Sequence, residues 1–361
     1  MLKIQHFIKN TVNRQKYVYN KNVKGVEIQM KKIILLLLSL TLLLFNIVSC
    51  GKKEDDAVQK QAIENTNKII SMVVPDGLPS IASAQLIKDN IKIKGYSMKY
   101  SIESSPENIV SEVLKGDVDI AIVPSNISAT QYNKDAGYVI ASTIGWGSFY
   151  LISTDEKTDI NDLKDKEIYN IGKGLTPDII FKSILKDKGF NLDNDFDFSY
   201  VNSVSEEAPL LIAGKANYAV ITEPALSQVS NKINNVNVVM DLNEEWKKVN
   251  DSEYGYPQST LIIKKDLAKN DKAFVSKFLQ GLKDSCKFAN ENPEETANFC
   301  EEIGVSTDKN IIPKAIEKAN INYVSINDCY KNYETYFQKL YDFDSATIGG
   351  KIPDEAIFMG K

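Results

Sequence analysis

The chain has 361 residues, with 43 Lys+Arg against 48 Asp+Glu and a net charge of −5. Its single histidine, His6, and its single arginine, Arg14, both lie near the N-terminus. The rest of the chain therefore cannot use histidine as a general base or metal ligand, and cannot hold an anion in a guanidinium fork. The acidic balance, which reaches −12 for residues 50–361, argues against nucleic acid as a partner.

Residues 30–49 have the layout of a secretory signal peptide. Met30-Lys31-Lys32 is basic, residues 33–48 are apolar, and Cys50 follows Ser49. A cysteine directly after the cleavage site resembles the lipobox of bacterial lipoproteins, which implies that Cys50 is lipidated. A single transmembrane anchor is the alternative, although the apolar run is shorter than the roughly 20 residues that span a bilayer.

Residues 1–29 precede this signal and are interpreted as an upstream extension that results from a translation start assigned too early. Residues 50–67 are polar and are predicted to form a flexible tether behind the lipidated cysteine. About 290 residues remain, which suits two domains of ordinary size.

From Lys68 onward, strand patterns alternate with helix patterns. Strands are predicted at 69–74, 96–103 and 119–123, helices at 81–91 and from Pro106, and a fourth strand within 138–150, interrupted by Gly145-Trp146-Gly147. Strands that alternate with helices at this spacing predict a doubly wound α/β fold with parallel strands.

The stretch 168–182, IYNIGKGLTPDIIFK, restarts the pattern with a strand, a glycine-flanked loop and a helix start. Thr176 is the predicted N-cap, Pro177 suits the first helical position, and Asp178 favours the positive helix end. The free N–H groups of such a turn suit ligand binding, although many such turns only connect a strand to a helix. No GxxxxGK[ST] follows, so the stretch is not a Walker loop.

Further strands are predicted at 198–200, 218–221 and 237–240, helices at 206–213 and from Ala225, and a mostly helical region at 265–345. A faint internal repeat relates 114–123 to 212–221, with a glycine at the helix end and an apolar strand behind it in each copy. The repeat supports two equivalent lobes and places Ser125 opposite Glu223.

Three cysteines, Cys286, Cys300 and Cys329, follow Cys50 and are too widely spaced for a zinc motif. A disulfide between Cys286 and Cys300 and three buried free thiols are both compatible with the sequence.

Ligands of open α/β sheets bind beyond the carboxyl ends of the strands. Six loops are therefore expected around one cleft between the lobes: 76–80, 124–126, 143–146, 173–176, 202–205 and 222–224.

The order of several short motifs along the chain resembles that of substrate-binding proteins of bacterial ABC importers. The resemblance is to the nitrate/sulfonate/taurine group in particular, which includes thiamine-precursor binders. The motifs are the signal with its lipobox, VPDGLPS (74–80), KGDVDIAIVPSN (115–126), GKGLTPD, ITEP and the tail IGGKIPD (348–354). The resemblance implies a type II periplasmic-binding fold of two α/β lobes. Lobe I would comprise 68–148 plus 255–361 and lobe II 150–250, with crossings near 146–152 and 250–258.

By position, the resemblance implies ligand contacts from Ser80, Ser125 and Asn126 in lobe I, and from Gly174, Thr176 and Glu223 in lobe II, with Trp146 as a flat apolar wall near the hinge. Lys173 is a further candidate ligand contact, with a side chain that faces solvent as the alternative. The Glu223 carboxylate would repel a multiply charged anion. A neutral or partly cationic heteroaromatic ligand, such as a pyrimidine precursor, is therefore expected. No cofactor, metal or catalytic group is expected.

The resemblance also implies a monomer, exported and held by its lipid at the outer face of a bacterial membrane, which hands a small molecule to an ABC permease. Two alternatives remain open. One is an enzyme on the same fold that acts on a small heterocycle or carboxylate, and the other is a surface receptor or adhesin.

Overall fold

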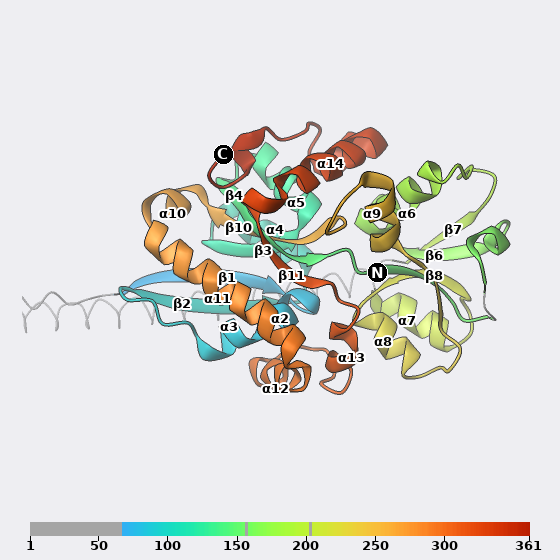
Figure 1. The fold of residues 1–361 in the computed structure, drawn as a ribbon, viewed down its shortest axis with the longest axis horizontal. Helices are drawn as coiled ribbons and strands as arrows, with labels where there is room; N and C mark the ends of the chain where they lie inside the picture. The colour runs from blue at the N-terminus through green and yellow to red at the C-terminus, as the bar shows by residue number, and fades with distance from the viewer. Residues whose placement is uncertain (1–66, 156–157, 202–203) are drawn as a thin grey trace, which may run out of the picture. The chain divides into compact units, whose positions relative to one another are not determined.

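The computed structural model describes residues 67–155, 158–201 and 204–361, which belong to one compact unit, Asn65–Lys361 (Figure 1). The extension 1–29, the signal 30–49, Cys50 and nearly all of the tether 50–67 lie outside the described residues. Within the described ranges, no helix is both long enough and apolar enough to cross a membrane.

The first sheet has six strands in the order β11-β4-β10-β3-β1-β2. They are β1 Lys68–Pro75, β2 Tyr96–Glu103, β3 Ile120–Pro124, β4 Tyr138–Trp146, β10 Pro257–Lys264 and β11 Ile321–Ser325. β1, β2 and β3 are parallel, as predicted. β10 is antiparallel to both β3 and β4, and β11 is antiparallel to β4.

The second sheet has five strands in the order β7-β6-β8-β5-β9. They are β5 Phe149–Ser153, β6 Glu167–Ile171, β7 Asp197–Val201, β8 Tyr218–Thr222 and β9 Asn237–Asp241. β6 is parallel to β7 and β8, whereas β5 is antiparallel to β8 and β9. We call the six-stranded sheet with its helices lobe I, and the five-stranded sheet with its helices lobe II.

The prediction of parallel strands does not hold for β5, β10 and β11, which run antiparallel to their neighbours, and the sequence pattern predicts no strand at 257–264 or 321–325. β5 enters the second sheet beside the carboxyl end of β8, where Phe149 pairs with Thr222. β10 enters the first sheet beside the carboxyl ends of β3 and β4 in the same way. A strand that arrives at that edge must run opposite to its neighbours, and hydrophobic periodicity carries no information on strand direction.

The helices of lobe I are α2 Leu78–Ala82, α3 Ala84–Asp89, α4 Pro106–Lys115, α5 Ser125–Asn133, α10 Lys265–Asn270, α11 Lys272–Glu291, α12 Pro293–Ile303, α13 Ile312–Ile316 and α14 Ile326–Asp344. Lobe II has α6 Thr176–Asp187, α7 Val204–Ile212, α8 Ala225–Ser230 and α9 Leu242–Asn250. Residues 265–345 are mostly helical, as predicted, apart from β11. The single helix predicted at 81–91 is two helices, because the backbone leaves the helical conformation at Ser83.

Each face of the lobe I sheet has its own apolar core. The core that includes Ile70, Met72 and Ile144 packs under α2, α3, α11 and α12. The core on the other face packs under α4, α5 and α14, and continues into lobe II through Trp146, Tyr256 and Trp246. The two lobes therefore share one continuous layer of buried apolar side chains.

Cys286, Cys300 and Cys329 are free and buried. Of the two states that the sequence allows, the structure has the three free thiols and not the disulfide between Cys286 and Cys300. Burial raises the pKa of each of these thiols to about 12, which keeps them protonated and unreactive at neutral pH.

Two short segments join the lobes. Residues 147–148 lead from β4 to β5, and residues 251–256 lead from α9 to β10. They run side by side, because the N–H of Gly147 donates to the carbonyl of Tyr256 at 3.0 Å. We call them the first and the second crossing.

Candidate functional site

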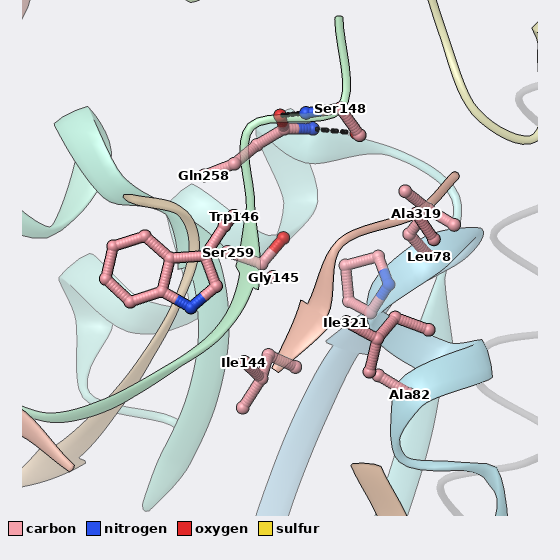
Figure 2. Close-up of a pocket in the computed structure, with 11 residues that line it drawn as sticks. Leu78, Ala82, Ile144, Gly145, Trp146, Ser148, Gln258, Ser259, Ala319 and Ile321 are labelled. Carbon is pink, nitrogen blue, oxygen red and sulfur yellow. Dashed lines mark hydrogen bonds between the residues drawn. The ribbon is translucent and has the colours of Figure 1, made fainter. Parts of the chain in front are cut away.

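A small cavity lies in lobe I next to the first crossing (Figure 2). Its volume is about 10 Å³, close to the minimum for one water molecule. Most of the lining is apolar, and no lining residue is charged. The lining residues are Leu78, Pro79, Ala82, Ile144, Gly145, Trp146, Ser148, Gln258, Ser259, Ala319 and Ile321.

The polar side of this cavity is formed by a chain of hydrogen bonds that joins the lobes. The Oε1 of Gln258 accepts from the Ser148 N–H at 2.8 Å, and its Nε2 donates to the Ser148 Oγ at 3.0 Å (Figure 2). The Ser148 Oγ also lies 3.0 Å from the Oγ1 of Thr222, at the end of β8 in lobe II. The chain thus runs from β10 through the first crossing to lobe II.

Sequence reasoning missed Gln258 and Ser148 as polar groups of the site. Gln258 gives no signal in the sequence, since a lone glutamine at a strand start forms no motif. The contact depends on the pairing of β4 with β10, which joins residues more than a hundred positions apart.

Two predicted site residues from different lobes meet directly. The hydroxyl of Thr176 donates to the Oδ1 of Asn126 at 3.3 Å. Thr176 is the first residue of α6, and Leu175 takes the N-cap position, so the predicted cap is wrong by one residue. The Thr176 hydroxyl bonds across the lobe junction instead of capping its own helix.

Tyr336 of α14 lies at the same junction and was not predicted. Its side chain is fully buried, and no group in the described residues meets hydrogen-bond geometry with its hydroxyl. Burial raises the pKa of Tyr336 above its ordinary value, while the nearby Thr176 side chain and Asn126 backbone lower it. Tyr336 therefore lies near Asn126 and Thr176, and α14 gives no sequence signal for this because its pattern is that of an ordinary amphipathic helix.

The glycine loop before α6 is held from within lobe II. The N–H of Gly174 donates to the Oδ2 of the buried Asp178 at 2.8 Å, so this donor is already paired. Lys182 binds the same carboxylate at 3.0 Å. Lys173 is exposed. Ligand contacts of Lys173 and Gly174 stay predictions.

Glu223 is buried just before α8, with 2% of its surface exposed. Its carboxylate accepts from the N–H and from the hydroxyl of Ser227, both at 3.1 Å. Burial raises the pKa of Glu223 to about 7, opposed by these hydrogen bonds and by Lys318 and Lys314 of lobe I. Glu223 thus lies near the place where α8 of lobe II packs against α13 of lobe I.

The two predicted serines of lobe I are both buried and turned into their own lobe. The Ser80 hydroxyl donates to the Gly77 carbonyl at 2.8 Å. The Ser125 Oγ lies 2.6 Å from the Oγ1 of Thr260, which in turn lies 2.6 Å from the hydroxyl of Tyr333. Their contacts with a ligand stay predictions.

Trp146 is buried at the end of β4, with 2% of its surface exposed. Its indole N–H donates to the Asn322 carbonyl at 3.0 Å, and its ring lies 4.9 Å from that of Tyr254. In Figure 2 the ring lies on the other side of β4 from Leu78 and Ala319. Residues 143–146, expected as a loop, belong to β4, whereas 202–203 of another expected loop lie outside the described residues.

The chain is similar in structure to components of ABC transporters. A crystal structure of an ABC transporter from Parabacteroides distasonis is 26% identical, with a TM-score of 0.72, over 82% of this chain and 100% of that chain. The periplasmic aliphatic sulphonate-binding protein SsuA from Escherichia coli is 12% identical, with a TM-score of 0.67, over 82% and 93% of the two chains. The periplasmic nitrate-binding protein NrtA from Synechocystis PCC 6803 is 12% identical, with a TM-score of 0.56, over 78% and 84%.

The last two likenesses show the fold, which is that of the periplasmic binding proteins, as predicted. No curated protein sequence is significantly similar to the chain. The family model described as "NMT1/THI5 like" matches residues 92–296, more than half of the chain. The resemblance on which the sequence motifs converge is thereby confirmed, and the chain belongs to the NMT1/THI5-like family.

Proposed function

We propose that this chain is a solute-binding protein that captures a small molecule where its two lobes meet and delivers it to the permease of an ABC importer. The hydrogen bond between Thr176 and Asn126 carries the proposal, because it joins the first turn of α6 in lobe II to the first turn of α5 in lobe I and must break for these two helix ends to separate. Lobes that close on a ligand by a hinge motion and open to release it are a common design of binding proteins. The P. distasonis ABC transporter chain, matched along its whole length, supports the same role.

The chemistry of the lobe junction favours an uncharged or partly cationic ligand. No arginine occurs among the described residues, and no lysine lines the cavity. Glu223 adds a buried carboxyl group near the junction, where it accepts hydrogen bonds from Ser227. The walls are apolar, and the amide of Gln258 and the hydroxyl of Ser148 supply hydrogen bonds. In charge and hydrogen-bonding character a planar heterocycle suits these groups better than the anions named for the sulphonate- and nitrate-binding proteins, and it needs more room than the cavity of about 10 Å³ gives in this structure.

Export and anchoring form the second half of the proposal. The mature protein would begin at Cys50, carry lipid on that cysteine and stand as a monomer at the outer face of the membrane, tethered by residues 50–67. We expect the Cys50→Ser variant to incorporate no labelled lipid, with the folded part of the protein unchanged. Retention of lipid by this variant would contradict the anchor.

A thermal-shift screen tests the binding role. The probes are nitrate, methanesulfonate, taurine, thiamine, cytosine and aminopyrimidines. A ligand at a hundred times its dissociation constant adds about 2.7 kcal/mol to the free energy of unfolding. We expect a shift with the heterocycles and none with the anions. Chemical turnover of the bound probe would replace the transport role by an enzymatic one, and unchanged uptake after deletion of the protein would exclude the importer.

A further inference from the structure

Asn243, the second residue of α9 in lobe II, binds the second crossing on both sides of Gly255. Its Oδ1 accepts from the Tyr256 N–H at 3.2 Å, and its Nδ2 donates to the Tyr254 carbonyl at 3.1 Å. The side chain is 1% exposed. An N–H can only donate and a carbonyl can only accept, so these two partners fix which way the amide is turned.

The same amide occupies the space in front of a glycine in each crossing. A Cβ on Gly255 would lie 1.8 Å from the Asn243 Oδ1, and all three nearest atoms to it belong to Asn243. A Cβ on Gly147 would lie 2.5 Å from the same oxygen and 2.3 Å from the Tyr256 ring. Both crossings therefore pack against one side chain of lobe II, and each has a glycine at the point of contact.

This arrangement fastens part of each crossing to lobe II. Residues 254–256 are held to α9 by Asn243, and the second crossing also contacts lobe I, where the Asn332 amide donates to the Ser252 Oγ at 2.7 Å. Gly147 is tied to the same segment through the Tyr256 carbonyl, at 3.0 Å. Ser148 follows Gly147 in the first crossing, and residues 257–258, the first of β10, follow Tyr256 at the end of the second crossing. These are the residues that carry the Ser148–Gln258 hydrogen bonds beside the cavity.

We propose that Asn243 is the positioning residue of the hinge: it clamps both crossings to lobe II and so confines the closing motion to Ser148 and Gln258, next to the ligand. The inference rests on the proposed function, because it assumes that the lobes open and close. It makes Asn243 a determinant of capture without any contact between Asn243 and the ligand.

The test measures the distance between the lobes by single-molecule energy transfer. Dyes are attached to Lys99→Cys in lobe I and Lys215→Cys in lobe II, both exposed, in the full chain carrying Cys50→Ser. We expect Asn243→Ala to broaden the distance distribution and shift it to longer distances without any ligand. The matched control is Asn250→Ala, which removes an amide of the same helix that bonds to the Trp246 carbonyl within α9.

A suppressor pair supplies a second readout that does not depend on ligand or dyes. Gly255→Ala should lower the urea midpoint strongly, and adding Asn243→Ala should recover part of the loss, since the three atoms nearest to that Cβ all belong to Asn243. The strain of the positive φ of 96° at Gly255 remains, so recovery is incomplete. Gly147→Ala should not be recovered, because Tyr256 crowds it as well.

The inference is overturned if Asn243→Ala and Asn250→Ala give the same distances as the parent, or if Asn243→Ala makes Gly255→Ala worse. Should Asn243→Ala fail to fold, Asn243→Asp keeps the acceptor for Tyr256 and loses the donor to Tyr254, and a broadened distribution is expected for it too. Failure of every probe to bind, with the distance changes present, would count against the proposed function and leave the hinge assignment standing.

Discussion

The Thr176 hydroxyl and the Asn126 side-chain carbonyl lie 3.3 Å apart, one at the start of α6 in lobe II and the other in the first turn of α5 in lobe I. The fully buried Tyr336 lies near the same contact. This relationship links two residues that the sequence motifs single out separately, and it is a direct polar contact between two of the predicted ligand loops.

Replacement of Thr176 by valine keeps the shape of the side chain and removes the hydrogen bond to Asn126. We expect a loss of about 1 kcal/mol in the preference for the closed lobes, the usual net worth of one such bond. Measured by energy transfer between the lobes, the population should shift to longer distances. Thr130→Val is the control, because the Thr130 hydroxyl bonds within lobe I, to the carbonyls of Asn126 and Thr347. Equal distances for the two variants would contradict the role of Thr176.

Glu223 predicts a pH dependence of stability. Burial raises its pKa to about 7, above the ordinary value of 4.5, so the folded protein binds the proton more tightly than the unfolded chain does. Its stabilising contribution is complete below about pH 4.5 and is lost as the pH rises through 7, with a total on the order of 3 kcal/mol. Glu223→Gln should flatten the plot of unfolding free energy against pH in this window.

A second buried glutamate shapes the same plot and must be separated from Glu223. Burial raises the pKa of Glu207 on α7 to about 8, and neither carboxylate oxygen has a hydrogen-bond partner in the described residues. Glu207→Gln should remove the fall in unfolding free energy that extends up to about pH 8, and should leave the fall up to about pH 7 that is due to Glu223. An exposed control is Glu317→Gln. A Glu223→Gln curve parallel to that of the parent between pH 4.5 and 7 would refute the burial argument.

Asp178 is expected to be critical for the stability of lobe II. Its carboxylate is 1% exposed and holds both Lys182 and the Gly174 N–H. Asp178→Ala leaves a largely buried lysine without its counter-charge, which typically costs about 3 kcal/mol or more. Asp187 lies on the same helix, α6, and forms a more exposed pair with Lys339 of α14. Asp187→Ala should therefore cost at most about 1 kcal/mol. Urea unfolding of both variants makes the comparison, and similar losses would show that the Asp178 pair is not special.

The three buried cysteines are expected to react slowly with thiol reagents. Cys286, Cys300 and Cys329 are buried and free, and burial raises their pKa values. In a Cys50→Ser background, Ellman's reagent should label none of them in the native protein and all three in urea. Labelling of only one in urea without reductant would reveal a disulfide between the other two.

The sequence by itself determined the local order of the fold. Apolar runs located β1, β3 and β8, because a buried strand must be apolar whatever its neighbours are. The repeat of glycine and strand at 116–123 and 214–221 marked corresponding positions in the two lobes, since a left-handed helix end favours glycine in both. The order of short motifs was enough to place the chain in its family.

Only the tertiary structure decided strand direction and the groups that surround the lobe junction. β5, β10 and β11 run antiparallel because they enter their sheets from the edge where the lobes meet, and no local pattern records that edge. Gln258, Tyr336 and Asn243 act on residues far from them in the chain, through strand pairing, helix packing and crossing contacts. Their roles depend on which atoms come into contact when the chain folds, and the sequence pattern around each residue does not record those contacts.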